Sequence, residues 1–267
     1  LASRYGAGMR LLDYATKTEE SRKAINKWVS DRTNARIPEL IPGGVITPAT
    51  RLVLTNAIYL NAPWRFPFDE KTTGKAAFTK LDGTEIQADL MHLSENLRYA
   101  KADGYQAVEL PYAGGSLSMV VLAPDQGQFE AVESRLGDGV LDDAIGMLES
   151  ANVRLALPRF EFRTKAGLKD ALIEMGMPLA FEGGKADFTR MSARGKDLYI
   201  QDVIHEAFIS VDEKGTEAAA ATAVVVGETT APVETVDLTV DRPFLFAIRD
   251  NETGALLFMG RVLDPTV

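Results

Sequence analysis

Residues 51–64, RLVLTNAIYLNAPW, restrict the possible folds more than any other segment of the chain. They form a near-continuous apolar run that is rich in β-branched and aromatic residues. Such a run is typical of a strand buried on both faces of a sheet. It is shorter than the roughly 18 residues of a membrane span, and no other apolar run of the chain reaches that length.

Other segments add strands and helices around this one. Alternating apolar and polar residues predict half-buried strands over residues 152–164 and 197–215, and short strands with turns over 77–124. Residues 236–265 predict two apolar strands joined by the turn DNETG. A capping box of Thr16 and Glu19 predicts a helix over residues 19–32, and acidic, helix-like sequence follows from 129 to 150. Thr164 is expected to cap a further helix that ends before Gly176.

The chain shows no repeat and no linker that would divide it, so we expect a single α+β domain with large sheets over residues 1–267. The net charge of −9 argues against nucleic acid as the main partner. Cysteine is absent, which excludes disulfides and thiolate metal sites.

Motifs for catalysis are missing. The two histidines, His92 and His205, belong to no H-E-x-x-H pattern, and the chain has no G-x-S-x-G elbow and no glycine-rich nucleotide loop. Asp142 and Asp143 are read as a solvated face, and the sequon at Asn251 as a hairpin turn. We therefore expect no enzyme activity, no metal and no cofactor.

Residues 212–232, DEKGTEAAAATAVVVGETTAP, fit neither a good helix nor a good loop. Alanines favour helix and valines favour strand. At strand spacing, the positions from Thr216 to Val226 on one face are all small and uncharged. Such a segment can lie outside a fold and later become a central strand. The alternative interpretation is an alanine-rich connection.

The residues around this segment resemble the serpins, the loop-inserting protease inhibitors, and FISVDEKGTEAAAATA resembles the hinge of their reactive loop. The other resembling segments follow in the family's order and cover essentially the whole chain from Leu1. They are LVLTNAIYLNAPWRFPFD, YQAVELPYAGGSLSMVVLAP, LPRFEFRTKAGLKDALIEMGM, ADFTRMSARGKDLYIQDVIHEAFISVDEKGTEAAA and DRPFLFAIRDNETGALLFMGRVLDP. The resemblance implies a serpin fold, with a large mixed sheet and an exposed reactive loop at about residues 213–235. The first helices and some strands of a complete serpin domain are lacking.

The resemblance implies an inhibitor that acts as a single-use substrate. A serine protease cuts the loop and forms an acyl-enzyme, and the freed upstream half of the loop inserts into the main sheet and traps the protease. Gly215 would be the pivot, and Thr216 would be exposed or barely engaged before cleavage. In the inserted strand Thr216 would point into the protein and the Glu217 side chain would face solvent. The hinge residues are Glu213, Lys214, Gly215, Thr216, Glu217, Ala218, Ala219, Ala220, Ala221 and Thr222.

Three further residues are assigned by the resemblance to the region where the main sheet opens. Asn56 and His205 would be hydrogen-bonded to each other, and Trp64 would lie at the top of the sheet near the point of loop entry. The interpretation without the resemblance is a core histidine and a core aromatic.

Counting from the hinge places the reactive bond at Thr229–Thr230, whereas counting back from Arg242 ends near Pro232. No Lys or Arg lies between Val226 and Pro232, so an elastase- or subtilisin-like target is favoured over a trypsin-like one, and Glu228 leaves a Glu-specific protease open. A non-inhibitory serpin, such as a carrier or chaperone, and an inactive fragment are the alternatives. By the resemblance we expect a secreted, extracellular monomer.

Overall fold

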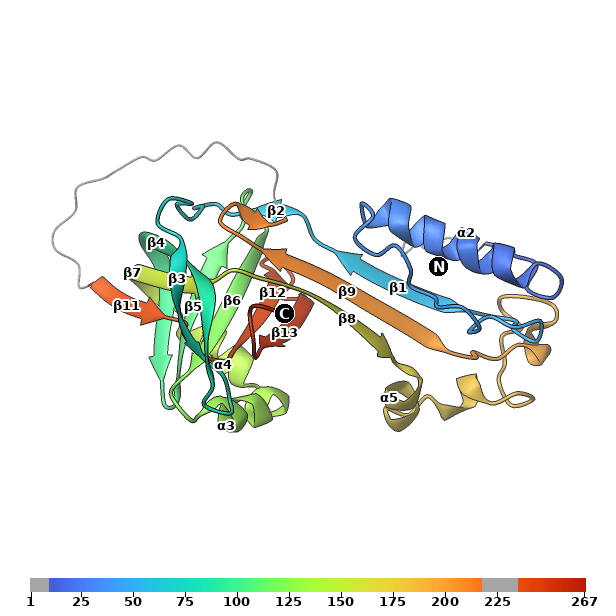
Figure 1. The fold of residues 1–267 in the computed structure, drawn as a ribbon. Helices are drawn as coiled ribbons and strands as arrows, with labels where there is room; N and C mark the ends of the chain where they lie inside the picture. Colours follow the sequence, from blue (N-terminus) through green and yellow to red (C-terminus); the bar gives the residue numbers. More distant parts are fainter. Residues whose placement is uncertain (1–9, 218–234) are drawn as a thin grey trace. The chain divides into compact units, whose positions relative to one another are not determined.

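The computed structural model describes residues 10–217 and 235–267 (Figure 1). The chain divides into two compact units. The first unit consists of Leu1–Tyr59 and Arg163–Phe208, and the second of Leu60–Phe162 and Ile209–Val267. Strand β9 passes from the first unit into the second, and both units combine strands with helices, as the predicted α+β class requires.

The first unit is built on a parallel pair of strands. Strand β1 pairs with β9 from Leu54↔Val203 to Tyr59↔Phe208, and helix α2 packs on this pair (Figure 1). Val29 of α2 lies in a core cluster with Ile204 and Phe208 of β9. The elements of this unit are α2 (Thr18–Arg32), β1 (Leu54–Tyr59), the end of β8 (Phe160–Gly167), α5 (Lys169–Glu174), the 3-10 turns η2 (Pro178–Phe181) and η3 (Gly195–Asp197), and most of β9 (Val203–Val211).

Helix α2 begins close to its predicted start, but the predicted capping box is wrong. Lys17 is the N-cap residue, and no side chain caps the helix. The Thr16 hydroxyl donates instead to the Asp13 carboxylate, and the Thr16 N–H lies 3.0 Å from Asp13 Oδ1. A local aspartate therefore holds the threonine in a turn before the helix, a competition that threonine side chains commonly undergo.

The predicted cap at Thr164 is wrong as well. Thr164 lies inside strand β8, which ends at Gly167. Helix α5 begins at Lys169, with Leu168 as its N-cap. Strand β8 pairs with β9, and the Leu168 N–H still donates to the Val203 oxygen at 2.9 Å. The ladder to β9 therefore holds Thr164 in extended conformation. The predicted helix end is confirmed, because Gly176 follows the C-cap Met175 with a φ of 99°.

Strand β1 exists as predicted, but the prediction that it is buried on both faces is wrong. Its six residues are half-buried or exposed, and Leu54 is 40% exposed. Within the described part of the chain, β1 pairs only with β9, so its other edge has no partner strand. Apolar composition thus predicted the strand correctly but not its surroundings.

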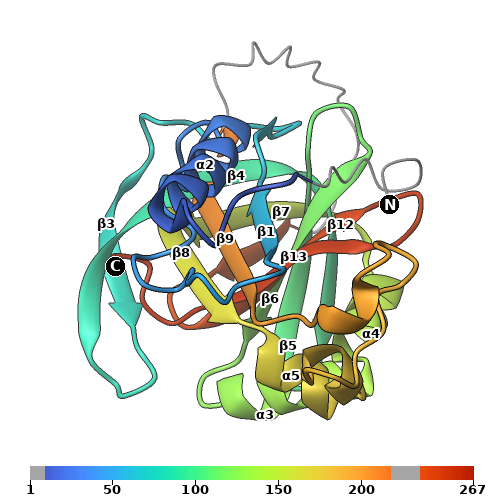
Figure 2. The same ribbon diagram turned by 90° about the vertical axis from the view of Figure 1, so that its right-hand side faces the viewer.

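The second unit contains a sheet of eight strands in the order β11-β7-β4-β5-β6-β12-β13, with β3 paired to β4 in a long hairpin (Figure 2). Helices α3 and α4 contribute to a core cluster against β5, β6 and β12. The elements are β2 (Ala62–Pro63), β3 (Gly74–Thr79), β4 (Glu85–Ala102), β5 (Tyr105–Pro111), β6 (Leu117–Pro124), α3 (Phe129–Ser134), η1 (Arg135–Asp138), α4 (Val140–Met147), β7 (Glu149–Pro158), β10 (Gly215–Thr216), β11 (Thr235–Thr239), β12 (Phe244–Asp250) and β13 (Leu256–Val262).

The predicted C-terminal hairpin is confirmed. Strands β12 and β13 are antiparallel neighbours, and the predicted turn joins them. Gly260 of β13 lies against the ring of Phe246, where a Cβ atom would come within 2.7 Å of two ring carbons. Within the residues described, no helix is long and apolar enough to cross a membrane.

Candidate functional site

The hinge predicted from the sequence begins with a tight turn in the second unit. Strand β9 ends at Val211, and the Asp212 N–H donates to the Gly215 oxygen at 3.0 Å. The Asp212 side chain accepts from the N–H groups of Lys214 at 2.8 Å and Gly215 at 3.2 Å. One aspartate therefore fixes the whole turn, a role for which its short acceptor side chain is suited.

Strand β10 follows the turn and lies between two strands. Thr216 pairs with Val211 of β9 and with Ala62 of β2. Its side chain is completely buried, and its hydroxyl lies 2.6 Å from the Tyr112 hydroxyl. Burial raises the pKa of Tyr112 and outweighs the opposite effect of this hydrogen bond, so the phenol stays protonated.

The expectation that Thr216 is exposed or barely engaged is therefore wrong. Tyr112 supplies a partner for the threonine hydroxyl, so the side chain can be buried without an unsatisfied polar group. Both sides of its backbone face a neighbouring strand as well. Gly215, which closes the turn, and Thr216 are thus already part of a sheet.

Trp64 packs against the same turn. It is 2% exposed, its ring stacks on Tyr112 with centroids 4.5 Å apart, and its indole N–H donates to the Asp212 oxygen at 2.9 Å. The Trp64 backbone N–H donates to the Lys214 oxygen at 2.8 Å. This tryptophan thus holds the turn from both its ring and its backbone.

Glu213 ties the turn to two other parts of the second unit. Its carboxylate is buried, Arg159 Nη2 lies 2.6 Å from both of its oxygens, and the Thr73 hydroxyl donates to it at 2.6 Å. Burial by itself would raise the pKa of this carboxyl. The hydrogen bonds from Thr73 and Arg159 outweigh burial and hold the pKa of Glu213 below its ordinary value.

Glu217 is the last residue that the structure describes before the segment 218–234. Its N–H donates to the Ser210 oxygen at 3.0 Å, and its φ is 50°. The side chain is half-buried here. Its orientation in the inserted strand stays a prediction. The remaining predicted hinge residues, Ala218 to Thr222, and the predicted reactive bond Thr229–Thr230 lie outside the described residues.

Asn56 and His205 belong to the first unit, on β1 and β9. They are partners in the parallel register, and His205 Nδ1 lies 2.9 Å from Asn56 Oδ1. The contact that the resemblance implies is therefore present. The role of the pair in sheet opening stays a prediction.

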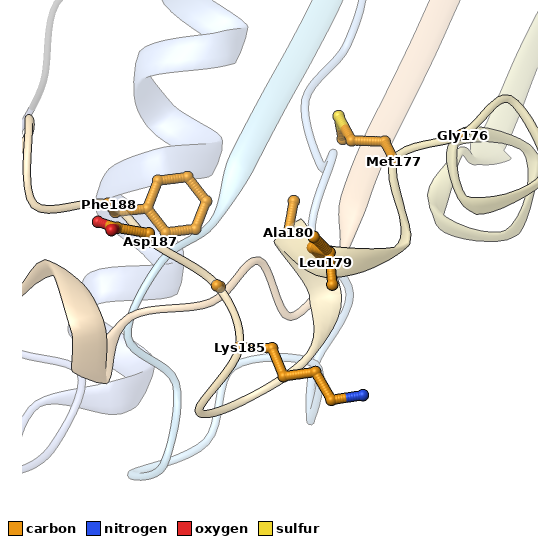
Figure 3. Close-up of a pocket in the computed structure, with 8 residues that line it drawn as sticks. Gly176, Met177, Leu179, Ala180, Lys185, Asp187 and Phe188 are labelled. Carbon is orange, nitrogen blue, oxygen red and sulfur yellow. The ribbon is translucent and has the colours of Figure 1, made fainter.

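Hollows of the surface are a second kind of candidate site. One of about 360 Å³ lies in the first unit beside Met177, Leu179 and Phe188 (Figure 3). Its charged residues are engaged within their own loop, because Lys185 pairs with Glu182 at 2.5 Å and Asp187 accepts from Thr189 at 2.6 Å. Among residues 10–217 and 235–267, no cluster of His, Cys, Asp or Glu could hold a metal.

The hinge is held by residues elsewhere in the chain that the sequence did not identify. Tyr112, Arg159 and Thr73 come from three distant parts of the chain. Tyr112 contacts Thr216, whereas Arg159 and Thr73 both contact Glu213. The one available signal was Arg159, a charged residue between two apolar strand segments. Such a residue suggests a buried ion pair but does not identify the partner.

Comparisons with known proteins agree with the fold. The family model described as serpin (serine protease inhibitor) matches residues 1–265. An uncharacterized serpin-like protein of Thermococcus kodakarensis is 40% identical over 257 residues, which are 95% of this chain and 59% of that protein. The leukocyte elastase inhibitor of Sus scrofa is 38% identical over 274 aligned positions, covering 98% of this chain and 71% of the inhibitor.

Among solved structures, Serpin48 of the insect Tenebrio molitor superposes with a TM-score of 0.86 at 31% identity, covering 98% of this chain and 70% of Serpin48. The predicted serpin fold is thereby confirmed. The chain spans 57% to 62% of the length of five curated relatives, the Thermococcus protein among them. Because the family model matches residues 1–265, the chain belongs to the serpin family.

Proposed function

We propose that this protein inhibits serine proteases as a single-use substrate, by inserting its cleaved loop between strands β1 and β9. The protease's own serine attacks a loop bond and becomes acylated. The freed upstream segment then continues strand β10, and the acylated protease is carried with it. The protein needs no catalytic residue for this, in agreement with the missing catalytic motifs.

The observation that carries the proposal is the agreement of two strand registers. Strand β10 is antiparallel to both β9 and β2. Each further residue of its continuation would therefore lie opposite a residue one position earlier in the sequence on each side. Six residues after Thr216 comes Thr222. Six residues before Val211 comes His205, and six before Ala62 comes Asn56. Asn56 and His205 are already partners of each other in the register of β1 and β9.

An inserted strand would therefore fit between β1 and β9 without a shift or bulge. Thr222 would arrive between Asn56 and His205 and replace their direct hydrogen bond, since its hydroxyl can both donate and accept. One parallel ladder would be lost and two antiparallel ladders gained. Thr216 is already paired on both sides, which supports the proposal.

The sequence of the loop supports an elastase- or subtilisin-like target. Residues 218–234 contain no Lys or Arg, and Thr229, Thr230 and Ala231 at the predicted bond are small. Glu228 before the bond keeps a Glu-specific protease open. A relative that is 38% identical is named an inhibitor of leukocyte elastase. A bond at this place also leaves enough chain to fill the space beside β9, because the register reaches the first residue of β9 at Val224.

The proposal is tested with a panel of serine proteases that includes elastase-, subtilisin- and trypsin-like enzymes. We expect a complex that survives denaturing electrophoresis with an elastase- or subtilisin-like enzyme. The mass of the released C-terminal peptide should place the cut at Thr229–Thr230. Cleavage by every protease without any stable complex would favour the alternative of a carrier or chaperone-like serpin.

A matched pair of variants tests insertion itself. Ala220 would face the same side as the buried Thr216, two residues closer to it than Thr222. Ala220→Arg would bury an unpaired charge, which costs several kcal/mol, and should turn the inhibitor into a plain substrate. Ala220→Ser adds one small hydroxyl and should keep most of the inhibition. Equal stoichiometry of inhibition for both variants would contradict insertion of this segment.

A further inference from the structure

The charged residues of the chain are divided unequally between the two compact units. The first unit contains 16 Lys and Arg residues and 12 Asp and Glu residues, so its formal net charge is +4. The second unit contains 13 Lys and Arg residues and 26 Asp and Glu residues, so its formal net charge is −13. Together they give the net charge of −9 of the whole chain, and the excess of acid belongs entirely to the second unit.

Ion pairs within the second unit do not compensate this excess. Eight of its basic side chains are paired with acidic side chains of the same unit, and each such pair is nearly neutral at a distance. Many other acidic side chains are exposed and form no ion pair within residues 10–217 and 235–267, among them Asp82, Glu85, Glu130, Asp142 and Glu252. The second unit therefore produces a negative potential that acts on molecules approaching it.

This acidic unit also holds both attachment points of the proposed reactive loop. Glu217 and Thr235, the described residues on either side of the segment 218–234, both belong to the second unit. Asp69 is exposed close to the first of these points, because the N–H of the neighbouring Phe68 donates to the Glu213 oxygen of the hinge turn at 2.9 Å.

A second free carboxylate lies close to the other attachment point. Glu95 of β4 pairs in register with Val153 of β7, and Val153 pairs on its other side with Val236 of β11, the residue after Thr235. In the described part of the chain neither Glu95 nor Asp69 forms an ion pair. Each attachment point of the loop thus has an uncompensated negative charge near it, in addition to the field of the whole unit.

We propose that the target of this protein is a cationic serine protease, which the negative potential of the second unit draws to the loop. This inference rests on the proposed function and adds the sign of the partner's charge to it. The loop sequence decides which bond a protease can cut, whereas the potential acts before contact and changes the rate of encounter. An anionic protease with the same sequence preference would be repelled and would reach the loop more slowly.

Salt determines how much of the unit contributes. The Debye length is about 30 Å at 0.01 M ionic strength and about 8 Å at 0.15 M. At low salt, acidic residues across the whole unit act on a protease near the loop. At physiological salt, those close to the loop, such as Asp69 and Glu95, contribute most. Attraction of this kind changes association rates by roughly 10- to 1000-fold and falls steeply with ionic strength.

The test uses one cationic protease of elastase-like specificity before and after succinylation of its surface lysines. Succinylation replaces each ammonium group with a carboxylate, and hydrolysis of a small uncharged peptide substrate verifies that the protease's active site is unchanged. The second-order rate constant for formation of the stable complex is measured from about 0.01 M to about 1 M ionic strength. We expect this rate constant to fall roughly tenfold for the unmodified protease and to rise for the succinylated one. A salt dependence of the same sign for both forms, or none for either, would overturn the proposal.

A matched pair of double variants assigns the effect to the second unit. Asp69→Lys with Glu95→Lys reverses two charges near the loop. Asp170→Lys with Glu174→Lys reverses two exposed charges of helix α5 in the first unit, so both proteins gain the same net charge. At low salt we expect the first variant to react roughly threefold more slowly with the cationic protease, and the second to lose clearly less. Equal losses would refute the role of the acidic surface beside the loop.

Failure of the proposed function looks different. If neither form of the protease gives a complex that survives denaturing electrophoresis, inhibition itself is wrong, and the proposal about the charge of the target falls with it. If both forms give the complex with the same rate constant at every salt concentration, inhibition stands and only the charge of the target is refuted.

Discussion

Replacing Arg159 with Met should destabilise the protein by leaving the buried Glu213 carboxylate without its charged partner. Breaking a fully buried ion pair costs roughly 3–5 kcal/mol. The Arg159 side chain is 48% exposed, whereas that of Glu213 is 4% exposed, so solvent already screens part of the interaction. The hydrogen bond from Thr73 also remains. We therefore expect a loss of about 2 kcal/mol in the free energy of unfolding at pH 7.

The penalty should depend on pH in a defined direction. The pKa of Glu213 lies below its ordinary value of 4.5 in the folded parent, so its stabilising contribution is present above about pH 4.5 and disappears as the pH falls through the folded-state pKa. Without Arg159, burial is less opposed and the carboxyl takes up a proton more readily. The difference between parent and variant should therefore shrink as the pH falls below 4.5.

Urea denaturation at pH 7 and at pH 4 measures both effects. Arg154→Met is the matched control, because Arg154 pairs with Asp237 and both side chains are more than 60% exposed. That variant should lose about 0.5 kcal/mol or less. A penalty for Arg159→Met that stays constant between pH 7 and pH 4, or equals that of the control, would refute the role given to the buried carboxylate.

Substitutions at three other positions have clear expected outcomes. Ala35→Gly should raise the free energy of unfolding by about 0.5–1 kcal/mol, because Ala35 has a φ of 61° that glycine adopts without strain; chemical denaturation measures the gain. Gly260→Ala should cost about 1–3 kcal/mol, because the new methyl group meets the ring of Phe246, which packs against Phe160; a lower melting temperature is expected. Thr216→Val should cost about 1 kcal/mol through the lost bond to Tyr112, whereas Thr216→Arg should prevent normal folding in the uncut protein, as circular dichroism would show.

Long-range contacts explain most of what the sequence could not predict. The strands over residues 203–211 and 244–262 follow from local alternation and turn residues, and the structure has them there. The partner of Glu213 depends on Arg159, which is more than fifty residues away, and no local pattern encodes that contact. Burial of Thr216 depends in the same way on Tyr112.

The two wrong helix caps have a related cause. A threonine before an apolar run caps a helix only if its hydroxyl has no other hydrogen-bond partner and its backbone is not part of a strand. The Thr16 hydroxyl is hydrogen-bonded to the Asp13 carboxylate. Thr164 lies in strand β8, which pairs with β9. The contact of Asn56 with His205 came from the family resemblance instead, and the parallel register of β1 and β9 places the two residues side by side.

The turn at residues 212–215 has a mechanical consequence for the trap that we propose. A protease attached to the end of the inserted strand and pulling away from the turn would load that strand along its own axis. The hydrogen bonds of antiparallel strands run perpendicular to that axis, so they would be sheared together rather than peeled one after another. Asp212 and Trp64 anchor the opposite end of the strand. The arrangement resists withdrawal most strongly in the one direction in which a captured enzyme would pull.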